Sequence, residues 1–425
     1  MNLLTLHTFE SRFGRPPSEE EKNTSVQWLR GQTVLLRVDF NVPLDTKRQI
    51  TDDTRITATL PTIQWLRDRG AKIVLLSHLG RPKGTKNPAM SLMPVAERLQ
   101  TLLDTTIYFC DIMDEPETLT RSLNPGDIVL LENLRFHPEE KFNDDRFAQK
   151  FAMIGDFYVN DAFGLIHREH ASVHALASIF AQENKAFAGF LIEKECEALD
   201  AILHRKGRST SLAVLGGSKV SDKIILIESF ARRCKNILIG GAMGYTFMKA
   251  KGLSVGKSRV EKDKLSIARE VLETCAKRNT TLHLPIDHIC ATDFSEDAEF
   301  VTIDSPEIPA DMMGLDIGPK TKTMYGELVE NAGCIFWNGP MGVFEWSSTA
   351  EGTRAIAIAM NKATQKEAYT VVGGGDSAAA VEQMELAEAI SHISTGGGAS
   401  LKYLEQSETD PVKGLPGLQF LVPQS

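Results

Sequence analysis

Short runs of β-branched and aliphatic residues alternate with longer segments of helical period from Thr33 onward, and this alternation most constrains the fold. Many of the short runs end in Gly, Asp, Asn or His. Their near-continuous apolar character indicates strands covered on both faces, which is typical of parallel sheets with right-handed crossover connections. We therefore predict an α/β protein whose second half repeats the scheme of the first.

The expected strands fall into two groups, with helical patterns such as Thr54 to Arg69 between them. In the first half they are Thr33 to Phe40, Lys72 to Ser77, Asp127 to Leu131 and Phe157 to Asn160. In the second half they are Leu212 to Leu215, Asn236 to Ile239, Thr281 to Ile286, Cys334 to Trp337, Tyr369 to Val372 and His392 to Ser394.

Three further segments organise the chain. Residues 190–204 carry Leu191, Cys196, Leu199 and Leu203 at the spacing of one apolar helical face, so we predict an interdomain helix there. The first 30 residues contain prolines and an acidic run, which predicts a loosely held arm. The tail from Ser407 contains Pro and Gly at several positions, and we expect it to be a wrapping segment rather than a helix.

Composition excludes several classes of protein. A chain of 425 residues corresponds to two or three domains, and 42% hydrophobic with 24% charged residues is typical of a soluble globular protein. A formal net charge of −9 argues against binding to nucleic acid through the overall field. The six cysteines lack zinc spacing, and no secretory signal or membrane-spanning window is found. We therefore expect a cytoplasmic protein.

In the first half, the residues that follow the predicted strands are rich in Arg and His. Ligands of open parallel sheets bind at the carboxyl ends of strands, so these residues are candidates for one site. Because the guanidinium group binds phosphate with a planar fork of donors, we expect an anionic ligand. The candidates are Asp39, Asn41, Arg55, His78, Arg81, Asn133, Arg135, Asp161, His167, Arg168 and His170.

In the second half, the strand ends are rich in glycine. Glycine lets backbone N–H groups approach phosphate oxygens, and a following helix N-terminus adds a favourable dipole. This pattern predicts a site for nucleotide phosphates, although a glycine pair on its own is more often a tight strand-to-helix turn. The glycine-rich ends are residues 216–219, 240–241, 338–342, 373–377 and 395–398.

Two other functions fit parts of this pattern. Gly373, Gly375 and Ala378 match a dinucleotide fingerprint, which would suit an NAD-dependent oxidoreductase, but no acidic residue stands about 20 residues further on to hold a ribose. A two-domain solute-binding protein would also use anion sites at strand ends. It would require export, for which the sequence shows no signal.

Eight ordered motifs between about Thr33 and Glu405 resemble those of the phosphoglycerate kinase family. They are Arg37–Pro43, Ser77–Pro82, Glu132–Phe136, Val159–Gly164, Trp337–Pro340, Gly342–Glu345, Gly373–Asp376 and Ser394–Ser400. The resemblance implies two doubly wound, Rossmann-like domains facing a cleft, and reversible in-line transfer of a phosphoryl group between 1,3-bisphosphoglycerate and ADP after hinge closure. The implied boundaries are 1–189 with the tail 407–425 for the phosphoglycerate domain, 190–204 for the interdomain helix, and 205–406 for the nucleotide domain.

The resemblance also implies roles for individual residues. The phosphoglycerate ligands would be Asp39, Asn41, Arg55, His78, Arg81, Arg135 and Arg168. The nucleotide ligands would be Gly217, Lys219, Lys223, Gly241, Asn338, Pro340, Gly342, Glu345, Gly374, Gly375, Asp376 and Ser377. Arg55, Lys219, Gly374 and Gly397 would act on the transferring group, and Asp376 would hold Mg²⁺. The expected protein is a monomer with small-molecule substrates and without a nucleic-acid or membrane partner.

Overall fold

The structure is a computed structural model that describes residues 1–13, 29–111, 121–204, 210–406 and 410–423. The chain divides into two compact units. Unit 1 comprises Met1–Glu197 and Ser407–Ser425, and unit 2 comprises Ala198–Gln406. The helix α9 (Phe190–His204) therefore begins in one unit and ends in the other.

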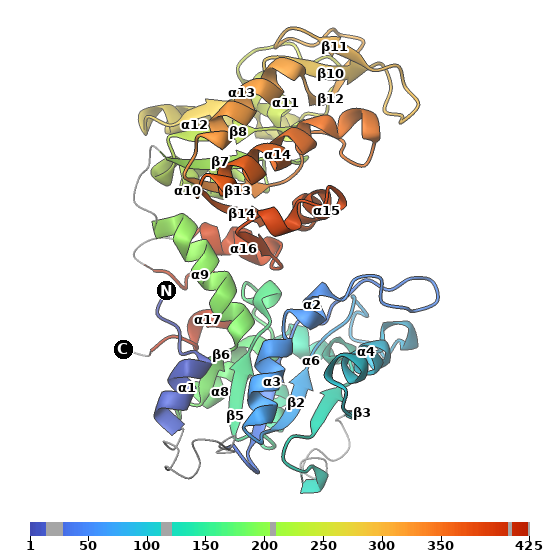
Figure 1. Cartoon of the computed structure of the whole chain (residues 1–425), viewed down its shortest axis with the longest axis vertical. Coiled ribbons are helices and arrows are strands. Elements are labelled where there is room, and N and C mark those ends of the chain that lie inside the picture. Colours follow the sequence, from blue (N-terminus) through green and yellow to red (C-terminus); the bar gives the residue numbers. More distant parts are fainter. Residues whose placement is uncertain (14–28, 112–120, 205–209, 407–409, 424–425) are drawn as a thin grey trace. The chain divides into compact units, whose positions relative to one another are not determined.

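Unit 1 is built on a six-stranded parallel sheet in the order β3-β4-β2-β1-β5-β6. All residues of β1, β4 and β5 are buried, because helices cover both faces of the sheet (Figure 1). The strands are β1 (Thr33–Arg37), β2 (Lys72–Leu76), β3 (Ile107–Cys110), β4 (Ile128–Leu131), β5 (Phe157–Asn160) and β6 (Ala186–Ala188). The helices are α1 (Leu6–Phe13), α2 (Thr54–Thr57), α3 (Leu60–Asp68), α4 (Met93–Leu103), α6 (Pro138–Lys141), α7 (Asp145–Ala152), α8 (Leu176–Ala181) and α17 (Pro416–Gln419).

Unit 2 repeats this plan and adds a small second sheet. Its main sheet is parallel, in the order β15-β14-β13-β7-β8-β9, and a three-stranded antiparallel sheet has the order β11-β10-β12. The strands are β7 (Ser211–Leu215), β8 (Asn236–Ile239), β9 (Thr281–His283), β10 (His288–Ala291), β11 (Val301–Ile303), β12 (Met313–Ile317), β13 (Cys334–Asn338), β14 (Tyr369–Gly373) and β15 (His392–Ser394). The helices are α10 (Ile224–Arg233), α11 (Gly241–Ala250), α12 (Leu265–Lys277), α13 (Pro319–Glu330), α14 (Glu351–Gln365), α15 (Gly375–Gln383) and α16 (Gly398–Leu404).

The predicted α/β class and both parallel sheets are confirmed, and the errors concern short or interrupted elements. The strands β3 and β6 and the whole antiparallel sheet were not predicted. The expected helix from Thr54 to Arg69 is two helices, because Pro61 lacks the N–H that would bond to the Thr57 carbonyl. The first strand ends at Arg37 rather than Phe40, and the strand from Thr281 ends at His283 rather than Ile286.

The prediction of a loosely held N-terminal arm is wrong for residues 1–13. Leu6 and Phe9 on α1 are fully buried, and the Phe9 ring stacks on Phe187 of β6 with 4.5 Å between ring centroids. Thr5 also forms a parallel bridge with Ala188, so this segment protects the edge of the sheet. The remainder of the expected arm, residues 14–28, lies outside the described residues.

The returning segment 410–423 packs within unit 1. The Gly417 amide donates to the Ile166 carbonyl at 2.9 Å, and the Asn160 side chain donates to the Gly417 carbonyl at 3.1 Å. The Leu4 amide donates to the Leu421 carbonyl at 2.7 Å. This segment contains the short helix α17, which the sequence did not predict, while residues 407–409 of the expected wrap lie outside the described residues.

Candidate active site

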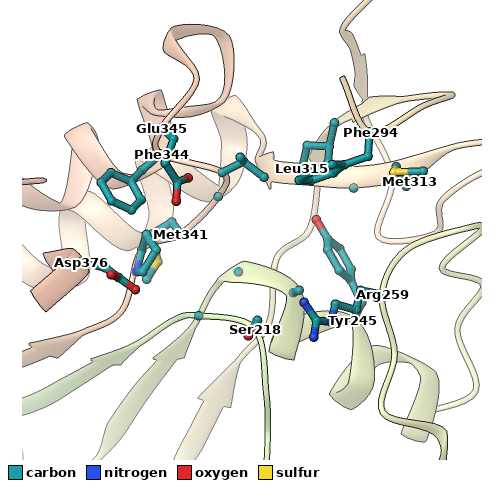
Figure 2. Close-up of a pocket in the computed structure, with 17 residues that line it drawn as sticks. Ser218, Tyr245, Arg259, Phe294, Met313, Leu315, Met341, Phe344, Glu345 and Asp376 are labelled. Atoms are coloured by element: carbon teal, nitrogen blue, oxygen red, sulfur yellow. The ribbon is translucent and has the colours of Figure 1, made fainter. Parts of the chain in front are cut away.

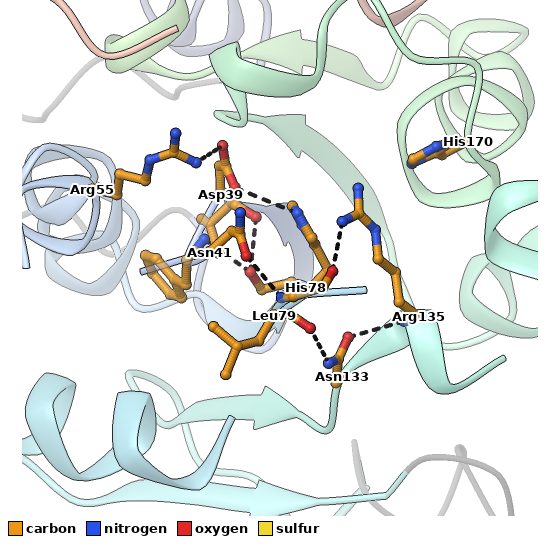
Figure 3. Close-up of polar contacts among 12 residues, drawn as sticks. Asp39, Asn41, Arg55, His78, Leu79, Asn133, Arg135 and His170 are labelled. Carbon is orange, nitrogen blue, oxygen red and sulfur yellow. Dashed lines mark hydrogen bonds and ion pairs between the residues drawn. The ribbon is translucent and has the colours of Figure 1, made fainter. Parts of the chain in front are cut away.

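A group of polar side chains, the basic site, gathers at the carboxyl edge of the sheet in unit 1. Asp39 and Asn41 follow β1, and Arg55 lies on α2. The Arg55 Nη1 donates to Asp39 Oδ2 at 2.7 Å (Figure 3). A Cβ atom on Gly164 would lie 2.4 Å from this same oxygen, so the loop after β5 can approach Asp39 only because residue 164 is a glycine.

The loops after β2 and β4 complete the basic site. The amide of Gly80, two residues after His78, donates to Asn41 Oδ1 at 2.8 Å, and Arg135 Nη1 donates to the Gly80 carbonyl at 2.9 Å. Asn133 Nδ2 donates to the Leu79 carbonyl at 2.7 Å (Figure 3). Asn41 and Arg135, two predicted ligands from different strand ends, are therefore linked through Gly80 in the loop after β2.

The electrostatics of the basic site favour an anion. Burial lowers the pKa of Arg135, and together with the neighbouring charges of Arg37 and Arg168 it brings this pKa to about 10 against the opposing carboxylates of Glu140 and Asp39. Arg81 and Arg168 are exposed, and no ion pair of either side chain occurs within the described residues. The uncompensated positive charge is available to a ligand.

Two histidines of this site, His78 and His170, are neutral at pH 7. Burial lowers the pKa of His78 well below its ordinary value, and the charges of Arg37 and Arg135 add to this effect. Burial likewise lowers the pKa of His170 to about 3, with smaller contributions from the same arginines. His167, another residue noted in the sequence, is half-buried.

In unit 2 the glycine-rich loops after β7, β13, β14 and β15 meet at the carboxyl edge of the main sheet. The Gly217 amide donates to the Pro340 carbonyl at 3.1 Å, and the Gly339 amide donates to Ser377 Oγ at 2.6 Å. Gly374 adopts φ of +96°, and a Cβ atom there would lie 2.5 Å from Asn338 Nδ2. This position therefore requires glycine for both backbone conformation and space.

Two adjoining cavities occupy this edge, and together they are called the glycine-rich site. The first has a volume of about 310 Å³ and the second about 550 Å³, and they share Gly217, Ser218 and Asp376. All twelve predicted nucleotide ligands line one or both. The smaller cavity is lined by Gly217, Lys219, Lys223, Asn338, Gly374, Gly375, Asp376, Ser377 and Gly397, and the larger by Gly217, Gly241, Pro340, Gly342, Glu345 and Asp376.

Charged groups of both signs face the smaller cavity. Burial lowers the pKa of Lys223 to about 8, and the carboxylates of Asp222 and Asp376 oppose this shift. Lys219 and Asp376 are exposed, and neither side chain forms a hydrogen bond or ion pair within the described residues. Asp376 lies in the first turn of α15, whose N-cap is Gly374, so its carboxylate is not the N-cap of this helix.

The far wall of the larger cavity contains residues that sequence reasoning missed. Tyr245, Arg259 and Phe294 line it, together with residues 313–315 of β12 (Figure 2). The Phe294 ring lies 4.6 Å from that of Trp346, between centroids. In the sequence, only the aromatic residue Phe294 among polar neighbours could have indicated this wall. The antiparallel sheet that brings the wall together has no strong sequence pattern.

Within the described residues no group of three or more His, Cys, Asp or Glu side chains is arranged to hold a metal ion by itself. Across the same part of the chain, every helix is too short or too polar to span a membrane.

The comparisons with known proteins agree with this geometry. A family model described as phosphoglycerate kinase matches residues 24–407. The chain belongs to the phosphoglycerate kinase family. A phosphoglycerate kinase of an Anaeromyxobacter species is 49% identical over 397 residues, covering 92% of this chain and 97% of that protein. That of Chlorobium phaeovibrioides is 48% identical over 404 residues, covering 95% and 99%.

Solved phosphoglycerate kinase structures are also similar. The Coxiella burnetii structure has a TM-score of 0.81 at 38% identity and covers 92% of this chain and 96% of that one. The Pyrococcus horikoshii structure has a TM-score of 0.77 at 32% identity, with 96% and 98% covered. The chain is thus a kinase of glycolysis that catalyses the reversible reaction of 1,3-bisphosphoglycerate and ADP to 3-phosphoglycerate and ATP. The oxidoreductase and solute-binding alternatives are excluded.

Proposed function

We propose that the basic site of unit 1 binds phosphoglycerate and that the glycine-rich site of unit 2 binds the nucleotide. The observation that carries this proposal is the convergence of the predicted ligands on the carboxyl edges of two separate sheets. In unit 1 the proposed ligands are Asp39, Asn41, Arg55, His78, Arg81, Arg135 and Arg168. In unit 2, Lys219 and the amides near Gly374 and Gly397 receive the phosphates, and Glu345 accepts from the ribose hydroxyls.

The proposed mechanism relies on positioning and on charge stabilisation. Phosphoryl transfer has little covalent chemistry for a protein to perform, so cationic groups around the three equatorial oxygens account for most of the acceleration. Arg55 and Lys219 supply those charges from the two units. The carboxylate of 3-phosphoglycerate attacks without a general base, which agrees with the neutral state of His78 and His170.

The residues present fit a magnesium ion that arrives with the nucleotide. Mg²⁺ is commonly bound by one or two carboxylates together with substrate phosphates, and the exposed Asp376 carboxylate faces the cavity proposed for the phosphates. The ion would supply charge neutralisation of the phosphate oxygens. We propose Asp376 as its protein ligand.

Replacing Asp376 by asparagine is expected to raise the KM for magnesium ATP by about tenfold or more, because a hard cation prefers a charged oxygen ligand. The KM for 3-phosphoglycerate should stay within about twofold, since that ligand binds unit 1. Steady-state kinetics with each substrate varied in turn would check this. Glu382→Gln, an exposed carboxylate on the same helix, is the control, and equal losses for both substrates would contradict the assignment.

Nucleotide affinity is expected to fall as pH rises through about 8. Burial lowers the pKa of Lys223 to about 8 in the free protein, and bound phosphates favour the protonated form, so the binding contribution is present below that pH and is lost above it. Titration calorimetry from about pH 6.5 to about pH 9.5, on both sides of that pKa, would measure the decline in nucleotide affinity. Lys223→Arg should remove it, and an unchanged decline in that variant would assign it to another group.

The overall assignment is tested by incubating purified protein with ATP, magnesium and 3-phosphoglycerate. ADP formation that requires both substrates is the expected result. ADP formation with ATP alone would indicate simple hydrolysis and would contradict the proposed acceptor site.

We further propose that residues 1–189 with 407–425 form the phosphoglycerate domain, 190–204 the linking helix and 205–406 the nucleotide domain of a cytoplasmic monomer.

Because Arg55 and Lys219 belong to different units, transfer requires hinge closure, for which α9 and the segment near Ser407 are the two covalent connections. Solution scattering should show a clear fall in radius of gyration with both substrates and a smaller fall with either one. A full decrease with nucleotide alone would contradict closure driven by both ligands.

A further inference from the structure

The guanidinium group of Arg37 is completely buried beside the basic site, and each of its three nitrogens lies within hydrogen-bond distance of a defined partner. Its Nε donates to Ser172 Oγ at 2.7 Å, and its Nη1 donates to the carbonyls of Val38 and Leu76. Its Nη2 lies 3.2 Å from His78 Nδ1. Arg37 is not one of the proposed substrate ligands, because its side chain is fully buried behind His78 and does not reach the exposed side of the site.

The contact between Arg37 and His78 determines where the imidazole proton resides. Arginine has only donors and keeps its charge in proteins, so the ring nitrogen that faces it must accept. A neutral imidazole that accepts at Nδ1 carries its proton on Nε2. We propose that Arg37 is a positioning residue that holds His78 as the neutral Nε2–H tautomer, so that His78 donates a hydrogen bond to an oxygen of the anionic substrate.

The surroundings of His78 agree with this tautomer. Its Nε2 lies 3.8 Å from Asp39 Oδ1, which is too long for a direct hydrogen bond. That oxygen is buried and has no hydrogen-bond partner within the described residues, whereas Oδ2 is bound by Arg55. Burial and the positive charges of Arg37, Arg135 and Arg55 disfavour the doubly protonated form of the ring, while the neighbouring His170 is neutral. The Nε2–H therefore stays available to a ligand.

A second buried contact fixes Arg37 from its other side. The Ser172 hydroxyl donates to Glu140 Oε1 at 2.6 Å, and the Ser172 amide donates to Oε2 at 3.0 Å. Because the hydroxyl proton is directed to Glu140, the oxygen lone pair faces Arg37 Nε. Ser172 lies in a π-helical turn, Ala171–Ala175, and the Glu140 carboxylate is also fully buried, 3.8 Å from Arg37 Nη2. This network leaves Arg37 one orientation, the one that donates to His78.

The tautomer can be observed directly. In protein labelled with ¹⁵N-histidine, NMR distinguishes protonated from unprotonated ring nitrogens, and His78→Gln identifies the His78 signals. We expect a proton on Nε2 and none on Nδ1 at pH 7, without any substrate. A proton on Nδ1, or on both nitrogens, would overturn the inference and leave the proposed substrate site untouched.

A double-mutant cycle tests the functional consequence, which rests on the proposed assignment of His78 to phosphoglycerate. Arg37→Lys should raise the KM for 3-phosphoglycerate about tenfold, the value of one hydrogen bond to a charged group, and leave the nucleotide KM unchanged. In a His78→Gln background, where an amide donates without a tautomer choice, the same change should cost about twofold or less. Equal losses in both backgrounds would show a merely structural role and overturn the inference.

Two further variants keep the inference testable if Arg37→Lys does not fold or if His78 does not bind the substrate. Ser172→Ala removes the acceptor for Arg37 Nε and should mix the His78 tautomers in the NMR spectrum even if Arg37→Lys does not fold. The inference would be overturned if His78 kept a single tautomer in Ser172→Ala and if Arg37→Lys folded with unchanged His78 signals. If His78→Leu leaves the KM for 3-phosphoglycerate unchanged, the proposed assignment of His78 to the substrate fails, irrespective of the tautomer.

Discussion

Replacing Arg55 by alanine is expected to lower kcat by about 10³-fold or more while the fold is retained, because an arginine that acts on a transferring phosphoryl group contributes on the order of 10³ to 10⁵ in rate. Its ion pair with Asp39 is about one-third exposed on the arginine side and contributes roughly 0 to 1 kcal/mol to stability. The catalytic loss should therefore greatly exceed any loss of stability. Steady-state kinetics and thermal unfolding of the same preparation would compare the two.

Arg69→Ala is the matched control for Arg55. Arg69 also forms a short ion pair, 2.8 Å from Glu10, but it follows α3 and precedes β2, at the amino edge of the same sheet. Its loss should lower the melting temperature slightly, because its guanidinium also stacks 3.9 Å from the Trp65 ring centroid, and should leave kcat within about twofold. An Arg55→Ala enzyme within tenfold of the original kcat would remove Arg55 from the proposed mechanism.

Replacing Lys219 by alanine is expected to lower kcat by about 10² to 10³-fold, the usual effect of removing one donor that stabilises charge in the transition state. Lys219 is exposed and has no polar partner within the described residues, so the free energy of unfolding should change by about 0.5 kcal/mol or less.

Lys362→Ala provides the comparison for Lys219. It removes an exposed lysine that pairs with Glu330 at 2.8 Å on the helices α14 and α13, outside both cavities. Single-turnover measurements with both substrates bound would separate the chemical step from binding. A defect confined to the nucleotide KM would place Lys219 in ground-state binding rather than in transfer.

The parallel sheets could be predicted from the sequence because their central strands are nearly continuous apolar runs. β1, β4 and β7 are buried along their whole length, so hydrophobicity alone marks them. The edge strands lack this signal. β3 is buried only at Ile107, and β6 has three residues that become a strand through pairing with β5 and bridging to Thr5. Their structure depends on tertiary contacts that no local pattern shows.

The candidate ligands were found for a related reason. Residues at the carboxyl ends of parallel strands meet at one edge, so Asn41, His78 and Arg135 could be grouped before their contacts were known. The buried side chains that support these ligands could not be predicted. In the sequence Arg37 lies inside the predicted strand Thr33 to Phe40, and nothing in its neighbours indicates that Ser172 and Glu140, more than 100 residues away, hold its side chain.

Asp316 shows the same limit in unit 2. It lies in β12, accepts hydrogen bonds from the amides of Gly352 and Ile317, and is so closely packed that a Cβ atom on Gly342 would lie 2.4 Å from its carboxylate. Burial raises its pKa to about 7. Such a carboxylate is expected on a surface from its sequence context, and only the packing of β12 against α14 places it in the interior.

Unit 1 consists of two segments, one before and one after unit 2 in the sequence, and this order has a consequence for folding during synthesis on the ribosome. Residues 198–406 form a continuous stretch, whereas unit 1 needs Gly417 and Leu421, which are translated after all of unit 2. Until they emerge, Ile166 and Leu4 lack the partners that satisfy their backbone groups. The part of the chain that is made first is therefore the part that finishes folding last, and proteolytic trimming before residue 417 would damage the basic site of unit 1 rather than the glycine-rich site of unit 2.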